Sequence, residues 1–383
     1  MNRGLFYKRD NKVKINLVNN KMFSLDETKK VLSSFPSSSE MDDVLTFHKS
    51  LGNIETPLIE LNHLSKKLGV GSILIKDESY RFGLNAFKVL GASYAMKKQL
   101  EQNPDITTFC TATDGNHGLA VAWMAQKIKR KAIIYMPKGS ARYRVNAIKD
   151  MNAEVIVIDK GYDTAVEIAN KRVIQGNTEV NDSWSLIQDT AWEGYEKIPL
   201  DIMKGYWTQM HEITSQINDR KIDLILLQTG VGSWAASIIS YVLNNWEDFP
   251  LFISVEPFSA NCLFESIKAG KRVKVNNNQS TCMAGLDCGT VSTLAWQILK
   301  NSISASISIS DNLTEEAMRI LSNPIKDDSV IIAGESGASG LGALIALKKN
   351  KKYNFLNTNT NILLISTEGD TDKVNYKKIM EME

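Results

Sequence analysis

The segment KDESYRFGLNAFKVLGA (residues 76–92) places one lysine, Lys88, at the junction between a predicted strand and a predicted helix. The run 72–75 is apolar and β-branched, as in a buried strand, and apolar residues recur at helical spacing from Ala86 to about Gln102. Because the N-terminus of a helix carries partial positive charge, we expect it to lower the pKa of Lys88 and to favour a neutral amine or an imine. The alternative is a surface lysine whose head lies in water, and the segment alone leaves both interpretations open.

Strand-like and helix-like segments alternate along the chain with short connections, which predicts an α/β protein with parallel sheets. Ligands bind where the strands of such sheets end, so the loops after the strands are the places to look for a site. Strands are predicted at residues 72–75, 108–113, 132–136, 154–159, 184–188, 224–229, 252–256, 330–333 and 362–366. Helices are predicted at 86–102, 117–129, 141–151, 163–175, 204–217, 234–244, 315–321 and 339–349.

The composition is that of an ordinary globular protein, with 383 residues of which 43% are hydrophobic and 23% charged. A net charge of +2 predicts neither nucleic-acid nor membrane binding. No window approaches the roughly 20 apolar residues that cross a bilayer. The first residues lack the apolar core of a signal peptide, so we expect a cytoplasmic protein.

The four cysteines, Cys110, Cys262, Cys282 and Cys288, are too few and too unevenly spaced for a secreted disulfide framework. No Cys-x-x-Cys pair indicates a metal. We therefore predict reduced, structural thiols and no metal site. Cys262 and Cys288 flank one loop-rich stretch, and their spacing does not show whether they bond.

Three of the predicted strands end in polar loops that contain glycine: TATDGNHG (111–118), QTGVGSW (228–234) and STEGDTD (366–372). The first offers a carboxylate, an amide and an imidazole at the start of a helix. The second can present backbone N–H groups at a helix N-terminus, which is a ready anion site for a phosphate. The third ends a buried strand with two hydroxyl groups.

Each loop also has a purely structural interpretation. Glycine after a strand usually only makes the turn, Asp114 could be a helix N-cap, and His117 could be a structural histidine. Each of these interpretations is reasonable alone, but a purely structural explanation requires all of them to hold at once.

The lysine turn followed in this order by the three loops resembles the fold type II enzymes of pyridoxal phosphate, the tryptophan synthase β and threonine dehydratase group. Within that group the chain is most similar to the 2,3-diaminopropionate ammonia-lyase family. The resemblance implies two open, twisted, mostly parallel sheets flanked by helices. It also implies a large domain from residues 1–88 and 192–383 and a small domain from 89–191 that closes over the substrate. The segments that carry it are residues 82–92, 113–123, 134–145, 188–199, 228–233, 283–289, 334–344 and 366–372.

The resemblance also implies roles for individual residues around the cofactor, pyridoxal 5'-phosphate. Lys88 would form the Schiff base, and Asn116 would hydrogen-bond the 3-hydroxyl oxygen. A hydroxyl from Ser366 or Thr367 would face the pyridine nitrogen. The backbone of one loop would cradle the phosphate, with residues Gly230, Val231, Gly232 and Ser233.

The implied reaction is β-elimination of D- and L-2,3-diaminopropionate to pyruvate and two ammonia through an external aldimine and aminoacrylate. Lys88 would take the Cα proton from the L-isomer and Asp114 from the D-isomer. An amine leaves well only when protonated, so the site should carry negative charge, which Asp114 and Asp189 would supply. By the same resemblance, His117 and Tyr162 would line the substrate side together with Asp189.

Two other functions stay open at this point. One is a related lyase or dehydratase acting on D-serine, threonine or a β-substituted alanine. The other is a cofactor-binding protein that senses amino acids without turnover. In each case the expected partner is a small amino acid, and the resemblance implies a homodimer.

Overall fold

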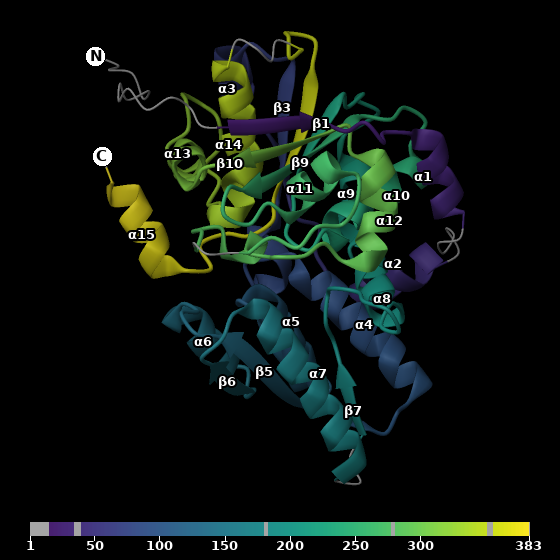
Figure 1. Cartoon of the computed structure of the whole chain (residues 1–383). Helices are drawn as coiled ribbons and strands as arrows, with labels where there is room; N and C mark the ends of the chain where they lie inside the picture. The colour runs from purple at the N-terminus through teal and green to yellow at the C-terminus, as the bar shows by residue number, and fades with distance from the viewer. Residues whose placement is uncertain (1–14, 34–39, 180–182, 277–279, 351–354, 383) are drawn as a thin grey trace.

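The computed structural model describes residues 15–33, 40–179, 183–276, 280–350 and 355–382. Within these ranges the strands form two sheets, one of seven strands and one of four, with helices on both faces (Figure 1). The seven-stranded sheet occupies the upper part of the molecule in this view and the four-stranded sheet the lower part. The predicted fold class, an α/β protein with two mostly parallel sheets, is confirmed.

The large sheet has the order β1-β10-β9-β8-β11-β3-β2, and the strands at its two edges run antiparallel to their neighbours. Its five inner strands are parallel and almost fully buried, because helices cover both faces. The strands are β1 (Ile15–Asn19), β2 (Leu58–Glu60), β3 (Ser72–Asp77), β8 (Leu224–Gln228), β9 (Leu251–Pro257), β10 (Ala305–Ile309) and β11 (Asn361–Ser366).

Alternate side chains of these inner strands enter two different hydrophobic cores. Leu224 and Leu226 of β8 pack in the core under α13 and α14, whereas Ile225 and Leu227 pack in the core that contains α10 and α12. The helices around this sheet are α1 (Leu25–Leu32), α2 (Met41–Ser50), α3 (Asn62–Leu68), α8 (Lys197–Gly205), α9 (Trp207–Gln216), α10 (Ser233–Asn245), α11 (Cys262–Ala269), α12 (Thr293–Ser302), α13 (Asp311–Ser322), α14 (Glu335–Lys349) and α15 (Lys373–Glu381).

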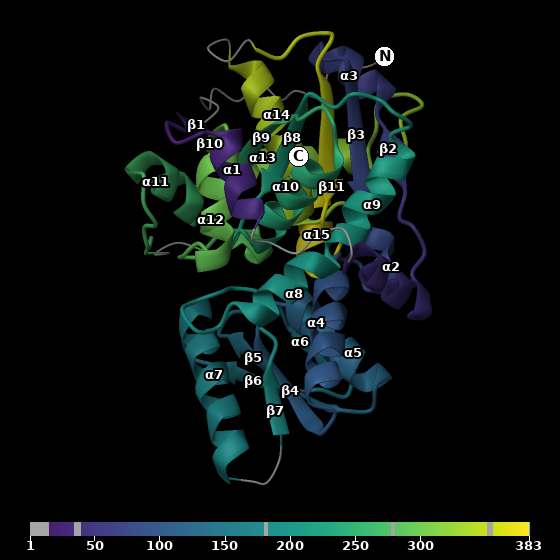
Figure 2. The same ribbon diagram turned by 90° about the vertical axis from the view of Figure 1, so that its right-hand side faces the viewer.

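The small sheet is fully parallel, with the order β6-β5-β4-β7. Helices α5 and α7 lie on its opposite faces, as Figure 2 shows. Its strands are β4 (Ile106–Ala112), β5 (Lys131–Pro137), β6 (Glu154–Ile158) and β7 (Ser183–Leu186), and its helices are α4 (Lys88–Gln102), α5 (Asn116–Lys127), α6 (Arg142–Lys149) and α7 (Tyr162–Glu179). Two 3₁₀ segments, η2 (Glu78–Gly83) and η3 (Ala284–Leu286), complete the described elements.

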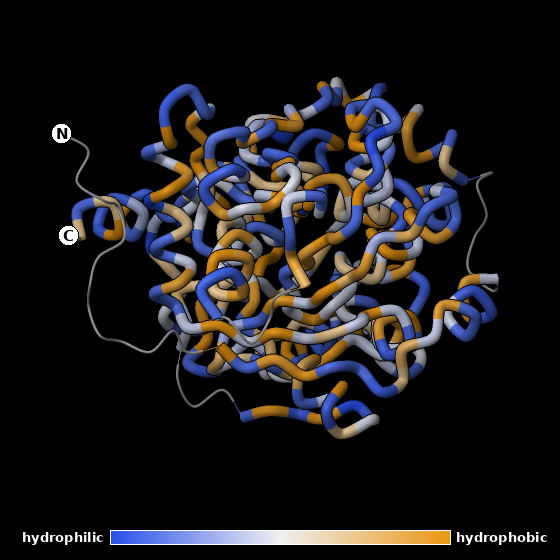
Figure 3. The backbone as a smooth tube through the Cα atoms, turned by 90° about the horizontal axis from the view of Figure 1, so that it is seen from above, coloured by the Kyte–Doolittle hydropathy of each residue, from blue (hydrophilic) through white to orange (hydrophobic). Residues whose placement is uncertain are grey.

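Apolar backbone segments run through the interior and polar segments form much of the periphery (Figure 3). One core cluster contains residues of both sheets, among them Phe109 and Ile134 of the small sheet and Ile225 and Leu363 of the large one. The two sheets are therefore packed against a shared set of helices. None of the described helices is long and apolar enough to cross a membrane.

Eight of the nine predicted strands are confirmed, and one is wrong. Residues 330–333 form no strand: Ile331 donates its backbone N–H to Leu321 O at 3.0 Å, and Val330 and Ile332 are exposed. The alternation of buried and exposed residues there comes from a loop that crosses the surface, not from a pleated sheet.

The prediction of one helix at 204–217 is also corrected. The structure has two helices, α8 and α9, that meet at Tyr206. Gly205 lies against the backbone of α4, and a Cβ at this position would come within 2.4 Å of Leu90 O. The close approach of α4 explains why the chain carries a glycine where the two helices meet.

Candidate active site

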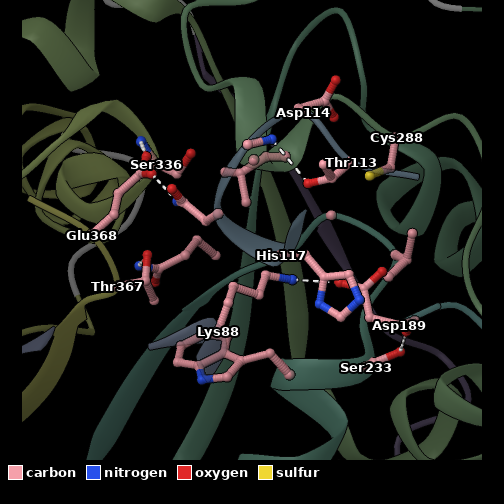
Figure 4. A pocket seen from close by; sticks show the side chains of 18 of the residues that line it. Lys88, Thr113, Asp114, His117, Asp189, Ser233, Cys288, Ser336, Thr367 and Glu368 are labelled. Atoms are coloured by element: carbon pink, nitrogen blue, oxygen red, sulfur yellow. Dashed lines mark hydrogen bonds and ion pairs between the residues drawn. The ribbon is translucent and has the colours of Figure 1, made fainter. Parts of the chain in front are cut away.

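The strand ends of the two sheets meet at one pocket, whose unfilled space, including its open mouth, is about 850 Å³. Lys88 comes from the turn after β3, and the loops after β8 and β11 of the same sheet face it. The loops after β4 and β7 of the small sheet close the other side (Figure 4). The pocket is lined by most of the predicted site residues: Lys88, Asp114, Asn116, His117, Tyr162, Asp189, Gly230, Val231, Gly232, Ser233 and Thr367.

Lys88 is the first residue of α4, where the sequence predicted a helix start. The turn before it needs unusual backbone, because Phe82 and Asn85 have positive φ angles of 50° and 61°. Hydrogen bonds to the loop after β11 hold this turn: Gly369 N donates to Asn85 O at 3.0 Å, and Phe87 N donates to Thr367 O at 3.2 Å. The lysine is thereby fixed against the STEGDTD loop.

The charge on Lys88 is set by Asp189, whose Oδ2 lies 2.5 Å from Lys88 Nζ. Burial opposes a charged lysine, but the carboxylate outweighs burial and raises the pKa of Lys88 above its ordinary value. Asp189 has the reciprocal shift: burial opposes its charge, but Lys88 lowers its pKa. The expectation that the helix start lowers the pKa of Lys88 is therefore wrong for this arrangement, since a contact ion pair is stronger than the helix field.

Asp114 lies on the loop after β4 and lines the same pocket. Burial, and then the nearby negative charge of Asp287, raise its pKa to about 7. In Figure 4 Asp114 appears at the top of the pocket and Lys88 below it. A carboxyl group with this pKa can both accept and release a proton near neutral pH.

His117 is buried and neutral in character. Its Nε2 lies 2.7 Å from Ile187 O, which assigns the ring proton to Nε2, and burial lowers its pKa. Its Nδ1 is buried without a hydrogen-bond partner among the described residues, so it is free to accept one from a ligand. Tyr162 donates its hydroxyl to Asp189 Oδ1 at 3.4 Å and accepts from Gln188 Nε2 at 2.9 Å.

Asn116 is the first residue of α5, and its side-chain Nδ2 donates in a close hydrogen bond to Glu368 Oε2. Glu368 also lines the pocket and is 1% exposed. The structure thus places Asn116 at the pocket, with one of its two amide N–H groups directed at a carboxylate.

The loop after β8 carries residues 230–233 to the start of α10. Gly232 has a φ of 92°, and a Cβ there would come within 2.8 Å of Leu299 Cδ1. A Cβ on Gly230 would lie 3.0 Å from Gly285 O and 3.1 Å from Cys288 Sγ. The first N–H groups of a helix have no partner within it, so this narrow loop presents donors to an anion.

Ser366 and Thr367 differ in position, although both are buried. Thr367 lines the pocket and accepts a hydrogen bond from Gln228 Nε2 at 3.1 Å. Ser366 is not among the lining residues, and its hydroxyl donates to Glu368 O at 3.3 Å. Of the two hydroxyls that the sequence offered, Thr367 is therefore the one at the pocket.

Several residues that line the pocket were given no role from the sequence, although most of them lie within the segments quoted above. Arg144 of α6 is buried and donates from Nη2 to Thr371 Oγ1 at 3.2 Å, with Glu335 and Glu368 carboxylates at 3.9 and 4.0 Å. Gln228 opens the quoted QTGVGSW loop, but it was given no role of its own. Glu368 lies inside the quoted STEGDTD loop, but its place at the pocket depends on contacts with residues that are distant in the sequence. The remaining lining residues include Phe87, Tyr206, Trp234, Ser336 and Cys288.

All four cysteines are free thiols in this structure. Cys262 and Cys288 both lie beside the loop after β8, since Cys262 Sγ is 3.7 Å from Gly230 O and Cys288 Sγ lies close to Gly230. Among the residues that the structure describes, no group of three or more His, Cys, Asp or Glu side chains could hold a metal ion.

These residues fit an aromatic phosphate-bearing cofactor. The pocket combines a half-buried lysine, a glycine-bearing helix start and an amide at Asn116, and it contains buried polar atoms without partners in the described residues. These atoms are His117 Nδ1, Gln228 Oε1 and Ser336 Oγ. Buried polar groups in proteins are normally hydrogen-bonded, so such atoms mark a place for a ligand.

Comparison with known proteins agrees with this assignment. The family model described as "Pyridoxal-phosphate dependent enzyme" matches residues 49–368. The chain is 40% identical to diaminopropionate ammonia-lyase of Escherichia coli over 96% of both chains. It is 43% identical to the enzyme of the same name from Salmonella typhimurium, over 88% of this chain and 91% of that one.

Solved structures give the same result. The crystal structure of the Escherichia coli lyase in complex with an aminoacrylate-PLP azomethine reaction intermediate matches with a TM-score of 0.88 and 39% identity, over 96% of this chain and 97% of that one. A threonine deaminase from Solanum lycopersicum matches with a TM-score of 0.73 at 23% identity over 96% of each chain, and so shares the fold. The chain therefore belongs to the pyridoxal-phosphate dependent enzymes and, within them, to the diaminopropionate ammonia-lyase family.

Proposed function

We propose that this protein is a pyridoxal phosphate-dependent lyase that converts 2,3-diaminopropionate to pyruvate and two ammonia. The observation that carries the proposal is the pairing of Lys88 with the buried carboxylate of Asp189, in a pocket that a second, half-buried carboxyl group, Asp114, also lines. A substrate with two amino groups needs compensating negative charge, and a pocket built for a neutral β-hydroxyl does not.

Pyridoxal phosphate, when bound, supplies the electron sink that makes the Cα proton acidic and allows the β-substituent to leave. Lys88 would hold the cofactor through Nζ. The backbone N–H groups of residues 230–233 would bind its phosphate, and Thr367 would supply a neutral hydroxyl to the pyridine nitrogen. A neutral hydroxyl there leaves the ring less protonated than an acid would, which favours prompt elimination over transamination.

Asp189 has a second task after the cofactor is attached. Its Oδ2 contacts Lys88 Nζ at 2.5 Å, and this ion pair would be lost whenever that nitrogen holds the cofactor or serves as a neutral base. The buried carboxylate then needs another cation, and the β-ammonium of the substrate provides one. Tyr162, within 3.4 Å of Asp189 Oδ1, helps to orient the carboxylate.

Proton removal from Cα needs a base on the side from which each isomer presents its proton. Lys88 serves the L-isomer, and Asp114, with its pKa of about 7, serves the D-isomer. The positions of the two groups in Figure 4, one above the other across the pocket, support this division. His117 Nδ1, which lacks a partner in the described residues, accepts a hydrogen bond from the substrate.

Three further features belong to the proposal. Residues 89–191 form a small domain that closes over the substrate and excludes water, while residues 1–88 and 192–383 form the large domain. The active form is a homodimer. The enzyme works in the cytoplasm on a small amino acid.

The test is product release from purified protein loaded with pyridoxal phosphate. Keto acid should form much faster from DL-2,3-diaminopropionate, as pyruvate, than from D-serine or L-serine, which also give pyruvate, or from threonine, which gives 2-oxobutyrate. A faster reaction with a hydroxy amino acid would instead identify a dehydratase. Cofactor binding without any keto-acid release would identify a sensor.

A further inference from the structure

Glu368 is a buried carboxylate at the pocket that the proposed chemistry does not use. It directly follows Thr367 after β11 and is 1% exposed. Its carboxylate accepts hydrogen bonds from Ser336 N at 3.0 Å, from Thr371 Oγ1 at 3.1 Å and, in a close contact, from Asn116 Nδ2. A buried carboxylate is costly unless it is well hydrogen-bonded, so an arrangement with three donors is one the fold sustains.

The contact with Asn116 joins the two sheets. Asn116 begins α5, which follows β4 of the small sheet, whereas Glu368 follows β11 of the large sheet. Glu368 also pairs through its backbone with Ala86, two residues before Lys88. The lysine turn and the α5 start are therefore held to the same residue.

The carboxylate also decides which way the Asn116 amide points. An ionised carboxylate only accepts hydrogen bonds, so it draws the amide nitrogen toward itself and repels the amide oxygen. The nitrogen carries two hydrogens, and Glu368 takes one. The second N–H is left to donate to a group inside the pocket.

We propose that Glu368 is a positioning residue that orients Asn116 so that the amide donates its second N–H to the 3-oxygen of the cofactor. This inference rests on the proposed function, because it takes pyridoxal phosphate as the ligand. An amide in the opposite orientation presents its oxygen instead. A donor stabilises the anionic form of the 3-oxygen, whereas an acceptor favours its protonated form.

A structural role alone is the competing explanation. Ser336 lies in the first turn of α14, and Glu368 satisfies its N–H at 3.0 Å, as a helix cap does. If this were its whole role, Glu368→Gln would change the stability of the protein and leave the cofactor unaffected. The side-chain oxygen of glutamine can still accept a hydrogen bond from Ser336 N. Its NH₂ group, however, donates to the side-chain oxygen of Asn116, so the Asn116 amide adopts the opposite orientation.

The first experiment is a pH titration of the visible absorbance of the resting holoenzyme, without substrate, for the wild type and Glu368→Gln. The matched control is Glu335→Gln, since Glu335 is equally buried and also lies near Arg144, but bonds to Asn375. We expect the titration midpoint to rise by about one unit in Glu368→Gln and to stay unchanged in Glu335→Gln. An unchanged midpoint in Glu368→Gln, or an equal rise in the control, overturns the proposal.

The second experiment is a double-mutant cycle on cofactor affinity with Asn116→Ala. Glu368→Gln should weaken the affinity by about tenfold, and the double variant should be within about twofold of Asn116→Ala alone, because Glu368 acts through Asn116. Additive losses overturn the proposal. If Glu368→Gln does not fold, the variant to test is Asn116→Asp, in which a carboxylate acceptor replaces the amide donor. An unchanged absorbance midpoint in Asn116→Asp would also overturn the proposal.

Neither readout involves turnover, so the two levels of the argument can fail separately. A wild type that binds the cofactor and shows the predicted midpoint shift, but releases no pyruvate from diaminopropionate, contradicts the proposed function and leaves the role of Glu368 intact. An active wild type together with an unshifted midpoint in Glu368→Gln supports the proposed function and contradicts the role of Glu368.

Discussion

Lys88 and Asp189 lie 2.5 Å apart, and this ion pair governs how the pocket handles positive charge. In the proposed function, the same carboxylate that raises the pKa of Lys88 would become available to a substrate cation. Charge at this position should therefore matter more for a diamine than for a hydroxy amino acid.

This reasoning predicts the effect of Asp189→Asn. Its kcat/KM for diaminopropionate should fall by about 30-fold more than its kcat/KM for serine, because a charge-assisted hydrogen bond to the β-ammonium is lost. Both constants are measured on the same cofactor-loaded preparation. Equal losses on the two substrates would show that Asp189 serves only Lys88.

A second prediction concerns Asp114, the proposed base for the D-isomer. Asp114→Asn should lower kcat for D-diaminopropionate by about 100-fold, a typical contribution of a general base, while kcat for the L-isomer changes far less. The assay is pyruvate release from each pure enantiomer. A similar loss for both isomers would remove the assignment of two bases.

The pH dependence follows from the raised pKa of Asp114. A carboxyl group must be ionised to accept a proton, and the pKa of Asp114 is about 7, so the D-isomer rate should decline as the pH falls through about 7. The L-isomer, deprotonated by Lys88, should lack this step. Parallel profiles of kcat for the two enantiomers would contradict the assignment.

The residues proposed to carry the chemistry could be found in the sequence, and those proposed to position them could not. Lys88, Asp114 and Asn116 stand in motifs beside strand ends, so their type and place were readable. Glu368 acts on Asn116 across 252 positions of chain, a pairing that only the folded structure defines. The error over the pKa of Lys88 has the same origin, because Asp189 is 101 positions away.

At the scale of single elements, the start of α10 shows how a short loop can create a binding surface. Gly232 caps this helix with a φ of 92°, and residues 230–233 line the pocket where the first N–H groups of the helix have no partner within it. A side chain at this position is opposed both by the backbone conformation and by Leu299.

Gly232→Ala should therefore weaken cofactor binding by about tenfold or more, since strain and overpacking each cost on the order of 1 kcal/mol or more. Gly52→Ala is the matched control: Gly52 has a similar φ of 88°, but a Cβ there would meet nothing within 4 Å. Affinity is measured by fluorescence titration of the cofactor-free protein. A loss no larger in Gly232→Ala than in Gly52→Ala would mean that this loop does not hold the phosphate.

Strands and helices were predicted correctly where the local sequence pattern determines them. The prediction failed where packing against distant residues determines the structure. The apolar inner strands of the large sheet were readable, but β10 (ASISI) was missed because serine alternates with its apolar residues. Its serines Ser306 and Ser308 are buried, and Ser306 pairs with Ser254 of the neighbouring strand at 2.7 Å. The break between α8 and α9 depends on the close approach of α4 to Gly205, which no local pattern reveals.

At the scale of the whole molecule, the pocket exists because two sheets bring their strand ends to one place (Figures 1 and 2). Lys88 and the loop of residues 230–233 follow strands of the large sheet, whereas Asp114, Asn116 and Asp189 follow strands of the small one. The α/β class followed from the alternation of strands and helices. The division into two sheets followed only from the family resemblance, because strand order is not written in any local pattern.

The central claim is that this arrangement eliminates a β-amino group, and the ratio of products tests it most directly. Wild-type enzyme loaded with pyridoxal phosphate should release two ammonia for each pyruvate from DL-2,3-diaminopropionate, and Lys88→Ala should release neither. One ammonia for each pyruvate, no pyruvate at all, or full activity in Lys88→Ala would contradict the account.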